Sequence, residues 1–238
     1  MKAVFISDAH LKNPCDKNYQ IILNFLDNLK DVNLLVILGD LFDFWNGRNK
    51  IAHKHHKPIL DKLLKLKNSG AKIIYLEGNH DFFMGRIFTE TLNADVYSDS
   101  AEITFDNKKI FLAHGDMVNK KDYGYRILRY FLRSWLMRIV FYILPSTMVW
   151  QIANAMSKGS RQYLAKGVKY DEMFIDYARD KWKQGYDAVM LGHAHSPKIF
   201  KQADNDSEKF YINPGDWISH FTCIVYEDKK FSMENFKI

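Results

Sequence analysis

Residues 34–45 have the sequence Leu-Leu-Val-Ile-Leu-Gly-Asp-Leu-Phe-Asp-Phe-Trp, in which an unbroken aliphatic run ends at a glycine and an aspartate. A short aliphatic run bounded by a turn signal is typical of a strand that is buried on both faces of a sheet. The two carboxylates that follow, Asp40 and Asp43, then lie just beyond the carboxyl end of that strand. The same order, polar residues after a buried strand, is repeated along the chain and predicts its fold.

Four other segments have the pattern of a short buried strand, and helical segments lie between them. The predicted strands are residues 3–7, 72–76, 110–113 and 188–191. Apolar residues recur at helical spacing in residues 19–29 and 59–66, and Gly70 marks the end of the second helix. Strands that alternate with helices predict an α/β protein. Residues 101–112 and 210–231 are richer in strand patterns and predict a second sheet.

The length and composition predict one domain over residues 1–238. The chain has 238 residues, of which 47% are hydrophobic, enough for one sizeable core and too few for two ordinary domains. Cys15 and Cys223 are the only cysteines and have no Cys-x-x-Cys spacing, which favours a reducing, cytoplasmic compartment. The apolar run at the N-terminus is too short for the core of a signal peptide.

Polar side chains follow each of the five predicted strands. They are Ser7-Asp8-Ala9-His10, Gly39-Asp40, Gly78-Asn79-His80-Asp81, His114-Gly115-Asp116 and Gly192-His193-Ala194-His195. Because the loops beyond the carboxyl ends of strands in an α/β sheet converge on one crevice, we expect these residues to meet.

The types of side chain in these loops indicate a metal centre. The predicted ligands are Asp8, His10, Asp40, Asn79, His114, His193 and His195. A mixed set of oxygen and imidazole donors without thiolate suits Mn, Fe or Zn. Seven donors are too many for one ion, so a shared carboxylate predicts two ions, which together can clamp a phosphoryl group and activate water. Each motif alone is more often a structural turn, but the ordered set predicts a phosphoesterase.

A basic, apolar segment interrupts this pattern. Residues 119–170 hold ten Lys and Arg against one acid, Asp122, giving this segment a net charge of +9 and the rest of the chain −3. Arg126, Arg129 and Arg133 recur at helical spacing, and we expect them to attract an anionic membrane and substrate phosphates. Pro145 separates two predicted helices. We predict a helical lid insertion over about residues 120–168 that caps the body or lies on a membrane surface. Ordinary core helices, with the charges on a solvated face, are the alternative.

The ordered motifs Asp-x-His, Gly-Asp, Gly-Asn-His-Asp, His-Gly-Asp and Gly-His-x-His resemble those of the calcineurin-like metallophosphoesterase superfamily. The resemblance implies a four-layer αββα sandwich, in which helices flank two packed β-sheets. It implies that one metal is held by Asp8, His10, Asp40 and His195, and the other by Asp40, Asn79, His114 and His193, with Asp40 bridging. It also implies that His80 is a catalytic residue that stabilises or protonates the leaving group.

Further motifs narrow the resemblance to the family of UDP-2,3-diacylglucosamine pyrophosphohydrolases. The residues concerned are 39–45, 78–82, His114-Gly115-Asp116 with Asp122 and Tyr125, and Asn213-Pro-Gly-Asp-Trp217. The resemblance implies hydrolysis of the diphosphate to lipid X and UMP in lipid A biosynthesis, with two divalent metal ions, Mn²⁺ being the expected metal. The best-known branch of that family has Arg where this chain has His80. The implied substrate-binding residues are Asn79, His80, Asp122, Tyr125, Arg126, Arg129, Ser157, Lys158 and Arg161.

The expected partners are a lipid-linked nucleotide sugar and the inner-membrane surface, with a cytoplasmic, peripheral location and neither a nucleic acid nor an obligate protein partner. A phosphoesterase for a soluble nucleotide or another phosphoester is the alternative. A nuclease is disfavoured because its groove would carry more Lys and Arg and fewer apolar residues. A non-catalytic scaffold is disfavoured by the complete ligand set. His53, His55 and His56 are predicted to form a solvated helix face rather than a third metal site, because no strand end delivers them.

Overall fold

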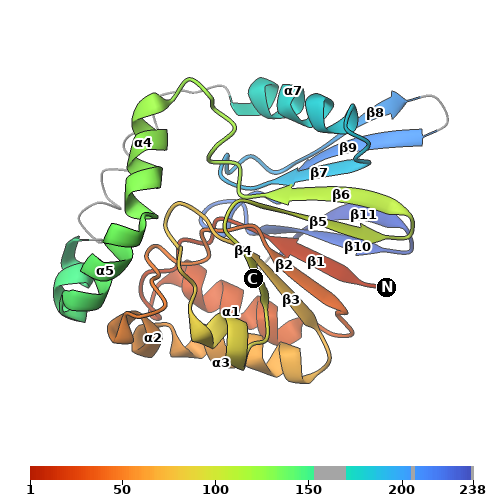
Figure 1. Cartoon of the computed structure of the whole chain (residues 1–238). Helices are drawn as coiled ribbons and strands as arrows, with labels where there is room; N and C mark the ends of the chain where they lie inside the picture. Colours follow the sequence, from red (N-terminus) through yellow and green to blue (C-terminus); the bar gives the residue numbers. More distant parts are fainter. Residues whose placement is uncertain (153–169, 205–206, 237–238) are drawn as a thin grey trace.

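The computed structural model describes residues 1–152, 170–204 and 207–236, which form two β-sheets between helices (Figure 1). The first sheet has the strand order β11-β10-β1-β2-β3-β4 and the second has β5-β6-β7-β9-β8. The strands are β1 (Ala3–Ile6), β2 (Leu34–Ile37), β3 (Lys72–Leu76), β4 (Asp95–Tyr97), β5 (Ser100–Phe105), β6 (Lys108–Ala113), β7 (Ala188–Leu191), β8 (Lys198–Asp204), β9 (Ser207–Asn213), β10 (Thr222–Glu227) and β11 (Lys230–Asn235). Strands β1 to β4 are parallel in the first sheet, as are β6, β7 and β9 in the second.

Helices cover the outer faces of the two sheets. The described helices are α1 (Lys17–Asn28), α2 (Lys50–His55), α3 (Lys57–Asn68), the π-helix η1 (Ile87–Thr91), α4 (Tyr123–Leu132), α5 (Trp135–Ile143) and α7 (Tyr170–Trp182). Figure 1 shows α1 and α3 below the first sheet and α7 above the second. The strands and helices predicted from residues 3–7, 19–29, 34–38, 59–66, 72–76, 110–113 and 188–191 are all confirmed.

The alternation of side chains along the central strands builds the four layers. In β1, Phe5 packs between the sheets, whereas Val4 and Ile6 pack against the helices on the outer face. In β7, Met190 faces the other sheet and Val189 faces α7. Because both faces of each central strand are covered, these strands are apolar throughout. The predicted αββα sandwich is confirmed.

One part of the second-sheet prediction is wrong. Residues 101–112 belong to the second sheet, but residues 210–231 are divided between the sheets. Strand β10 pairs antiparallel with β1 in the first sheet, with Val4 opposite Val225. Its Ile224 packs between the sheets and its Val225 packs on the outer face, the same pattern that a central strand of either sheet would show. The pattern in the sequence therefore did not distinguish the two sheets.

The described part of the insertion consists of α4, α5 and helical residues 146–152, with Pro145 between two helices as predicted. Figure 1 shows α4 and α5 at one side of the sandwich, outside its layers. No side chain of α5 is buried, and Trp135, Tyr142 and Ile143 are 73%, 72% and 72% exposed. The alternative of core helices is therefore wrong for α5. The one-domain prediction and the full extent of the insertion stay predictions, since residues 153–169 lie outside the described ranges. Within those ranges, no helix combines the length and apolarity that a membrane span requires.

The prediction of a solvated histidine face is wrong. His56 is fully buried, and its ring packs on Phe42, with centroids 4.6 Å apart, and beside Tyr19. His53 stacks on Trp45 at 5.0 Å. Neither ring nitrogen of His56 has a hydrogen-bond partner in the described residues, and burial lowers the pKa of His56 to about 3. These histidines thus serve as aromatic packing between α2, α3 and the first sheet.

This burial predicts a specific dependence of stability on pH. His56 stays neutral in the folded chain but takes up a proton in the unfolded chain below its ordinary pKa, so it lowers stability as pH falls from about 6.5 toward 3. We expect His56→Phe, which loses no hydrogen bond, to gain roughly 2–3 kcal/mol over the wild type between pH 7 and pH 4.5. Urea unfolding of both proteins at the two pH values measures this difference, and a gap that does not widen would contradict the assignment.

Candidate metal centre

The loops after β1, β2, β3, β6 and β7 meet at one end of the sandwich and are tied together by hydrogen bonds. The Asp8 N–H donates to the Gly39 carbonyl at 3.1 Å, and the His10 N–H donates to the Asp40 carbonyl at 2.9 Å. Carboxylates extend this network. The His193 N–H donates to Asp8 Oδ2 at 2.8 Å, and the His80 N–H donates to Asp40 Oδ1 at 2.8 Å. The loops therefore position one another before any ligand binds.

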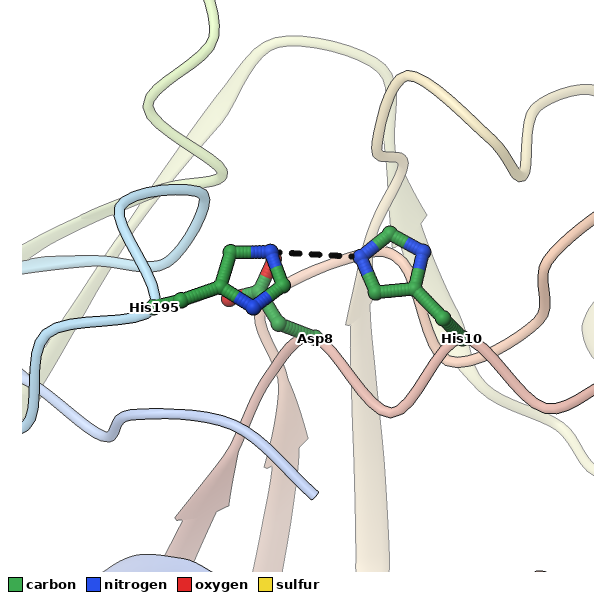
Figure 2. Close-up of side chains that lie close together, drawn as sticks. All are labelled: Asp8, His10 and His195. Carbon is green, nitrogen blue, oxygen red and sulfur yellow. Dashed lines mark hydrogen bonds and ion pairs between the residues drawn. The ribbon is translucent and has the colours of Figure 1, made fainter. Parts of the chain in front are cut away.

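Asp8, His10, Asp40 and His195 form the first group of donors. Figure 2 shows the His10 and His195 rings facing each other, with their Nε2 atoms 3.3 Å apart, and Asp8 beside them. Asp8 Oδ1 lies 3.7 Å from His195 Nε2, and Asp40 Oδ2 lies 3.7 Å from His10 Nε2.

Asp40, Asn79, His114 and His193 form the second group. Asn79 Oδ1 lies 3.0 Å from His114 Nε2 and 3.1 Å from His193 Nδ1. Asp40 Oδ2, which also faces the first group, lies 3.5 Å from His114 Nε2. The structure thus brings together all seven side chains that the sequence predicted as ligands, with Asp40 between the two groups.

The geometry fits two divalent ions. Two donors that bind one ion at ~2.1 Å lie ~3.0–3.5 Å apart, close to the separations found in both groups. Three clusters of side chains could each hold a metal ion: Asp8 with His10 and His195, Asp8 with Asp40 and His114, and His10 with Asp40 and His80. Asp8 Oδ1 is buried and has no hydrogen-bond partner in the described residues, an unusual state for a carboxylate oxygen. A divalent cation would be a suitable partner for these donors.

The backbone at these positions has the conformation expected of a functional site. Five of the seven predicted ligands have positive φ angles: Asp8 (54°), His10 (44°), Asp40 (53°), His193 (64°) and His195 (51°). Such a conformation costs of order 1–3 kcal/mol in a residue other than glycine and persists where the surroundings enforce it. Glycines in these loops leave room for the carboxylates to pack closely against the neighbouring backbone. A Cβ on Gly78 would lie 2.1 Å from Asp40 Oδ1, and one on Gly192 would lie 2.9 Å from Asp8 Oδ2.

The site is electrostatically suited to positive charge. Burial alone would lower the pKa of His114, but the Asp40 carboxylate and its hydrogen bond outweigh burial and raise it to about 10. Burial and the neighbouring His114 lower the pKa of His193 to about 4, which keeps this ring neutral. His114 Nδ1 donates to the Leu38 carbonyl at 2.7 Å, which directs Nε2 toward Asp40. A cation bound at Nε2 would replace the proton that His114 holds there.

His80 lies beside the donors but is bonded differently. Its Nδ1 donates to the Asp43 carbonyl at 2.9 Å, and its ring packs edge-on against His10 with centroids 4.7 Å apart. Its Nε2 is buried without a hydrogen-bond partner in the described residues. Since Nδ1 faces a carbonyl, Nε2 is the atom that can meet a substrate.

The predicted substrate-binding residues differ in the contacts that their side chains make. Asp122 caps α4 by accepting from the Tyr125 N–H at 3.0 Å, and the Tyr125 hydroxyl donates to Asp116 Oδ2 at 2.5 Å. Arg126 donates to the Met117 carbonyl at 3.1 Å. Ser157, Lys158 and Arg161 lie outside the described residues.

Arg129 has the environment of an anchor of α4. It is 7% exposed, and its guanidinium donates to Asp116 at 2.7 Å and to Asp99 at 2.9 Å. A membrane-facing role for Arg129 is therefore wrong, because its charge is paired within the protein. Its predicted contact with substrate stays a prediction.

Arg133 anchors the same helix to the loop after β3. Its Nη1 donates to Glu77 at 2.9 Å and its Nη2 donates to the Gly78 carbonyl at 2.8 Å. The expectation that Arg133 faces the membrane is therefore wrong as well, since the body holds both sides of its guanidinium. Its expected attraction of substrate phosphates stays a prediction. Helical spacing of arginines showed that they share a face but not what the face contacts.

Sequence reasoning missed the side chains that support the donors. Asp81, quoted only as part of a motif, accepts from the Asp40 N–H at 2.9 Å and from the Gly78 N–H at 3.0 Å, and thus joins two ligand loops. Asp116 accepts from α4 and follows His114 by two residues. An acid two residues after a predicted ligand was the available signal in both places.

The fold and the site define a metallophosphoesterase, and the chain belongs to the calcineurin-like phosphoesterase family, whose model matches residues 1–197. Among curated proteins, the chain is 30% identical over 230 residues to UDP-2,3-diacylglucosamine hydrolase of Haemophilus influenzae (strain PittGG), covering 94% of each chain. It is 29% identical over 231 residues to UDP-2,3-diacylglucosamine hydrolase of Aeromonas salmonicida (strain A449), covering 94% of this chain and 89% of that one. An archaeal phosphodiesterase of known structure matches with a TM-score of 0.48 and 16% identity over 99% of each chain.

Proposed function

We propose that the protein hydrolyses the diphosphate of UDP-2,3-diacylglucosamine to lipid X and UMP, as a step of lipid A biosynthesis. The observation that carries this proposal is the position of the donor cluster next to helices whose apolar side chains are exposed. A diphosphate needs the first feature and acyl chains need the second. Relatives that carry this substrate in their names match almost the whole chain, which supports the same conclusion.

The chain's own residues would divide the reaction between them. The seven donors would hold two divalent ions, and we propose Mn²⁺ because oxygen and imidazole donors without thiolate suit it. Bound ions would polarise the phosphoryl group and lower the pKa of the attacking water. His80, held at Nδ1 by the Asp43 carbonyl, would present Nε2–H to the leaving oxygen. Asn79 would both bind an ion and orient the phosphate.

We further propose that the insertion provides the lipid specificity. Exposed apolar residues of α4, α5 and residues 146–152 would contact acyl chains, each buried CH₂ contributing ~0.8 kcal/mol. That remote binding energy can be used to position the diphosphate at the metal centre. Lys120 and Lys121, which are exposed at the start of α4, would attract anionic lipid and hold the protein at the cytoplasmic membrane surface.

A variant with a trimmed lid tests this function. Trp135, Ile139 and Met148 are 73%, 42% and 47% exposed, so replacing all three by Ala should leave the fold intact. We expect kcat/KM for UDP-2,3-diacylglucosamine to fall ~10–100-fold, because acyl contacts are lost, while hydrolysis of bis-p-nitrophenyl phosphate changes little. Sedimentation with phosphatidylglycerol vesicles should also decrease, and wild-type binding should weaken as salt rises.

Other results would contradict the proposal. Equal losses on both substrates would mean that the insertion only supports the metal centre. A wild-type protein that cleaves soluble nucleotides well and ignores the lipid substrate would exclude a role in lipid A biosynthesis and favour the alternative of a soluble phosphoester.

A further inference from the structure

The loop from Asn213 to His220 contacts two of the metal-site loops. In the sequence, residues 213–217 indicated only a resemblance to a known family and no role of their own. The Ser7 hydroxyl donates to the Gly215 carbonyl at 2.8 Å, and the Trp217 N–H donates to the Asp8 carbonyl at 3.2 Å. The Asn213 side chain donates to the Gly192 carbonyl at 3.0 Å. This loop thus lies directly behind the residues that precede Asp8 and follow β7.

Asp216 is the most tightly held side chain in this loop. It is 1% exposed, and its Oδ1 accepts from the N–H groups of Ile218 at 2.8 Å, Ser219 at 2.7 Å and His220 at 3.1 Å. These bonds prevent rotation of the carboxylate and fix where Oδ2 points. Oδ2 faces two imidazoles, His220 Nδ1 at 2.7 Å and His195 Nδ1 at 3.5 Å.

His195 has its two nitrogens in opposite environments. Nδ1 faces Asp216. Nε2 faces the donor cluster, 3.3 Å from His10 Nε2 and 3.7 Å from Asp8 Oδ1 (Figure 2). A carboxylate accepts hydrogen bonds only, so it favours the tautomer with the proton on Nδ1 and a free lone pair on Nε2. His114 Nδ1 likewise donates to a fixed acceptor, the Leu38 carbonyl, within the core.

His195 needs such support more than the other histidines do. Its side chain is 27% exposed, compared with 3% for His10 and 1% for His114. The packing that orients those two rings is weaker around His195. A fixed carboxylate can replace it, because partners behind a ligating histidine set both its orientation and its basicity.

We propose that Asp216 is a positioning residue that sets the tautomer and orientation of His195, so that Nε2 completes the ion site shared with Asp8 and His10. The inference rests on the proposed metal centre, and it gives the residues 213–217 a function in metal binding. Asp216 would act only through His195, since its own oxygens are occupied by the loop and the two histidines.

The variant Asp216→Asn tests the tautomer directly. Asparagine keeps the size of the side chain, and its Oδ1 can keep the three backbone bonds. Its amide N–H₂ would then face His195 Nδ1 and donate to it, which favours the proton on Nε2 and blocks the lone pair needed for the ion. We expect one of two Mn²⁺ ions to bind ~10–100-fold more weakly, with the other unchanged. Titration of the metal-free protein with Mn²⁺, followed by the EPR signal of the free ion, measures both affinities.

His220→Gln is the matched control, because it removes the other imidazole on Oδ2 and leaves His195 in place. It should bind two Mn²⁺ ions as the wild type does. Wild-type affinity for both ions in Asp216→Asn would overturn the proposal. Loss of both ions together with a clearly lower unfolding temperature would also overturn it, since the role would then be structural.

A second measurement does not depend on whether Asp216→Asn folds. In the wild-type protein loaded with Zn²⁺, ¹⁵N-labelled histidine should show a protonated Nδ1 at His195, assigned by comparison with His195→Gln. A proton on Nε2 would overturn the proposal. Failure of the proposed function can be distinguished from failure of the role of Asp216. A wild-type protein that binds no Mn²⁺, or that does not hydrolyse the lipid substrate, would contradict the proposed function whatever the behaviour of Asp216→Asn.

Discussion

Asp40→Ala is expected to bind neither ion tightly and to have no measurable phosphodiesterase activity. Asp40 Oδ2 lies 3.7 Å from His10 Nε2 and 3.5 Å from His114 Nε2, so it faces both groups of donors. A carboxylate shared by two cations contributes negative charge to both sites at once, and its loss weakens both. Metal analysis after dialysis against Mn²⁺, together with turnover of bis-p-nitrophenyl phosphate, measures the two effects.

The variant Asp40→Asn separates charge from hydrogen bonding. Its Oδ1 can still accept from the His80 N–H, as Asp40 Oδ1 does at 2.8 Å, so the two loops stay joined. In Asp40→Ala that buried N–H loses its partner, which costs ~1–3 kcal/mol of stability. Both variants should lose the ions, but only Asp40→Ala should unfold at a lower temperature. Stoichiometric binding of two ions by Asp40→Asn would refute the bridging role.

His80→Ala is expected to lower kcat by ~10²–10⁴-fold, the range for a lost general acid, and to leave the metal content unchanged. The reason is geometric. His80 Nδ1 is held by the Asp43 carbonyl at 2.9 Å, and its Nε2 is buried beside the donors without a partner in the described residues. One ring nitrogen is therefore held by a backbone carbonyl, and the other is free for a proton transfer.

Chemical rescue sharpens this prediction. Added imidazole should restore part of the activity of His80→Ala if the lost group is a proton donor. The control variant His220→Gln changes an exposed histidine outside the donor cluster. It should have the wild-type kcat, and added imidazole should not change its activity. Loss of one ion in His80→Ala would instead place His80 among the metal ligands.

Much of the site was predictable because its residues carry local signals. Asp8, Asp40 and His193 each follow an apolar strand within three residues, and the ends of parallel strands meet at one edge. The same rule placed Asn79 and His114. The structure brings their donor atoms together, while their role as ligands stays a proposal that the metal titrations test.

The supporting residues were not predictable, because their partners are distant in the chain. Arg133 and Gly78 are separated by 55 residues, and Asp8 and His193 by 185. Charge and helical spacing identified the arginines but not Glu77 or Asp116 as their partners. His56 was predicted to lie on a solvated helix face because no strand end delivers it, whereas Phe42 and Tyr19 pack against it in the structure.

The sequence by itself determined the α/β class, the positions of the central strands and the polar side chains that follow them. The reason is that the periodicity of apolar residues and the chemistry of turns both act over a few residues. The tertiary structure alone decided that β10 joins the first sheet, that Arg129 and Arg133 anchor α4, and that Asp216 lies behind His195. These contacts depend on which buried surfaces pack together, and packing over the whole chain leaves no local pattern at either partner.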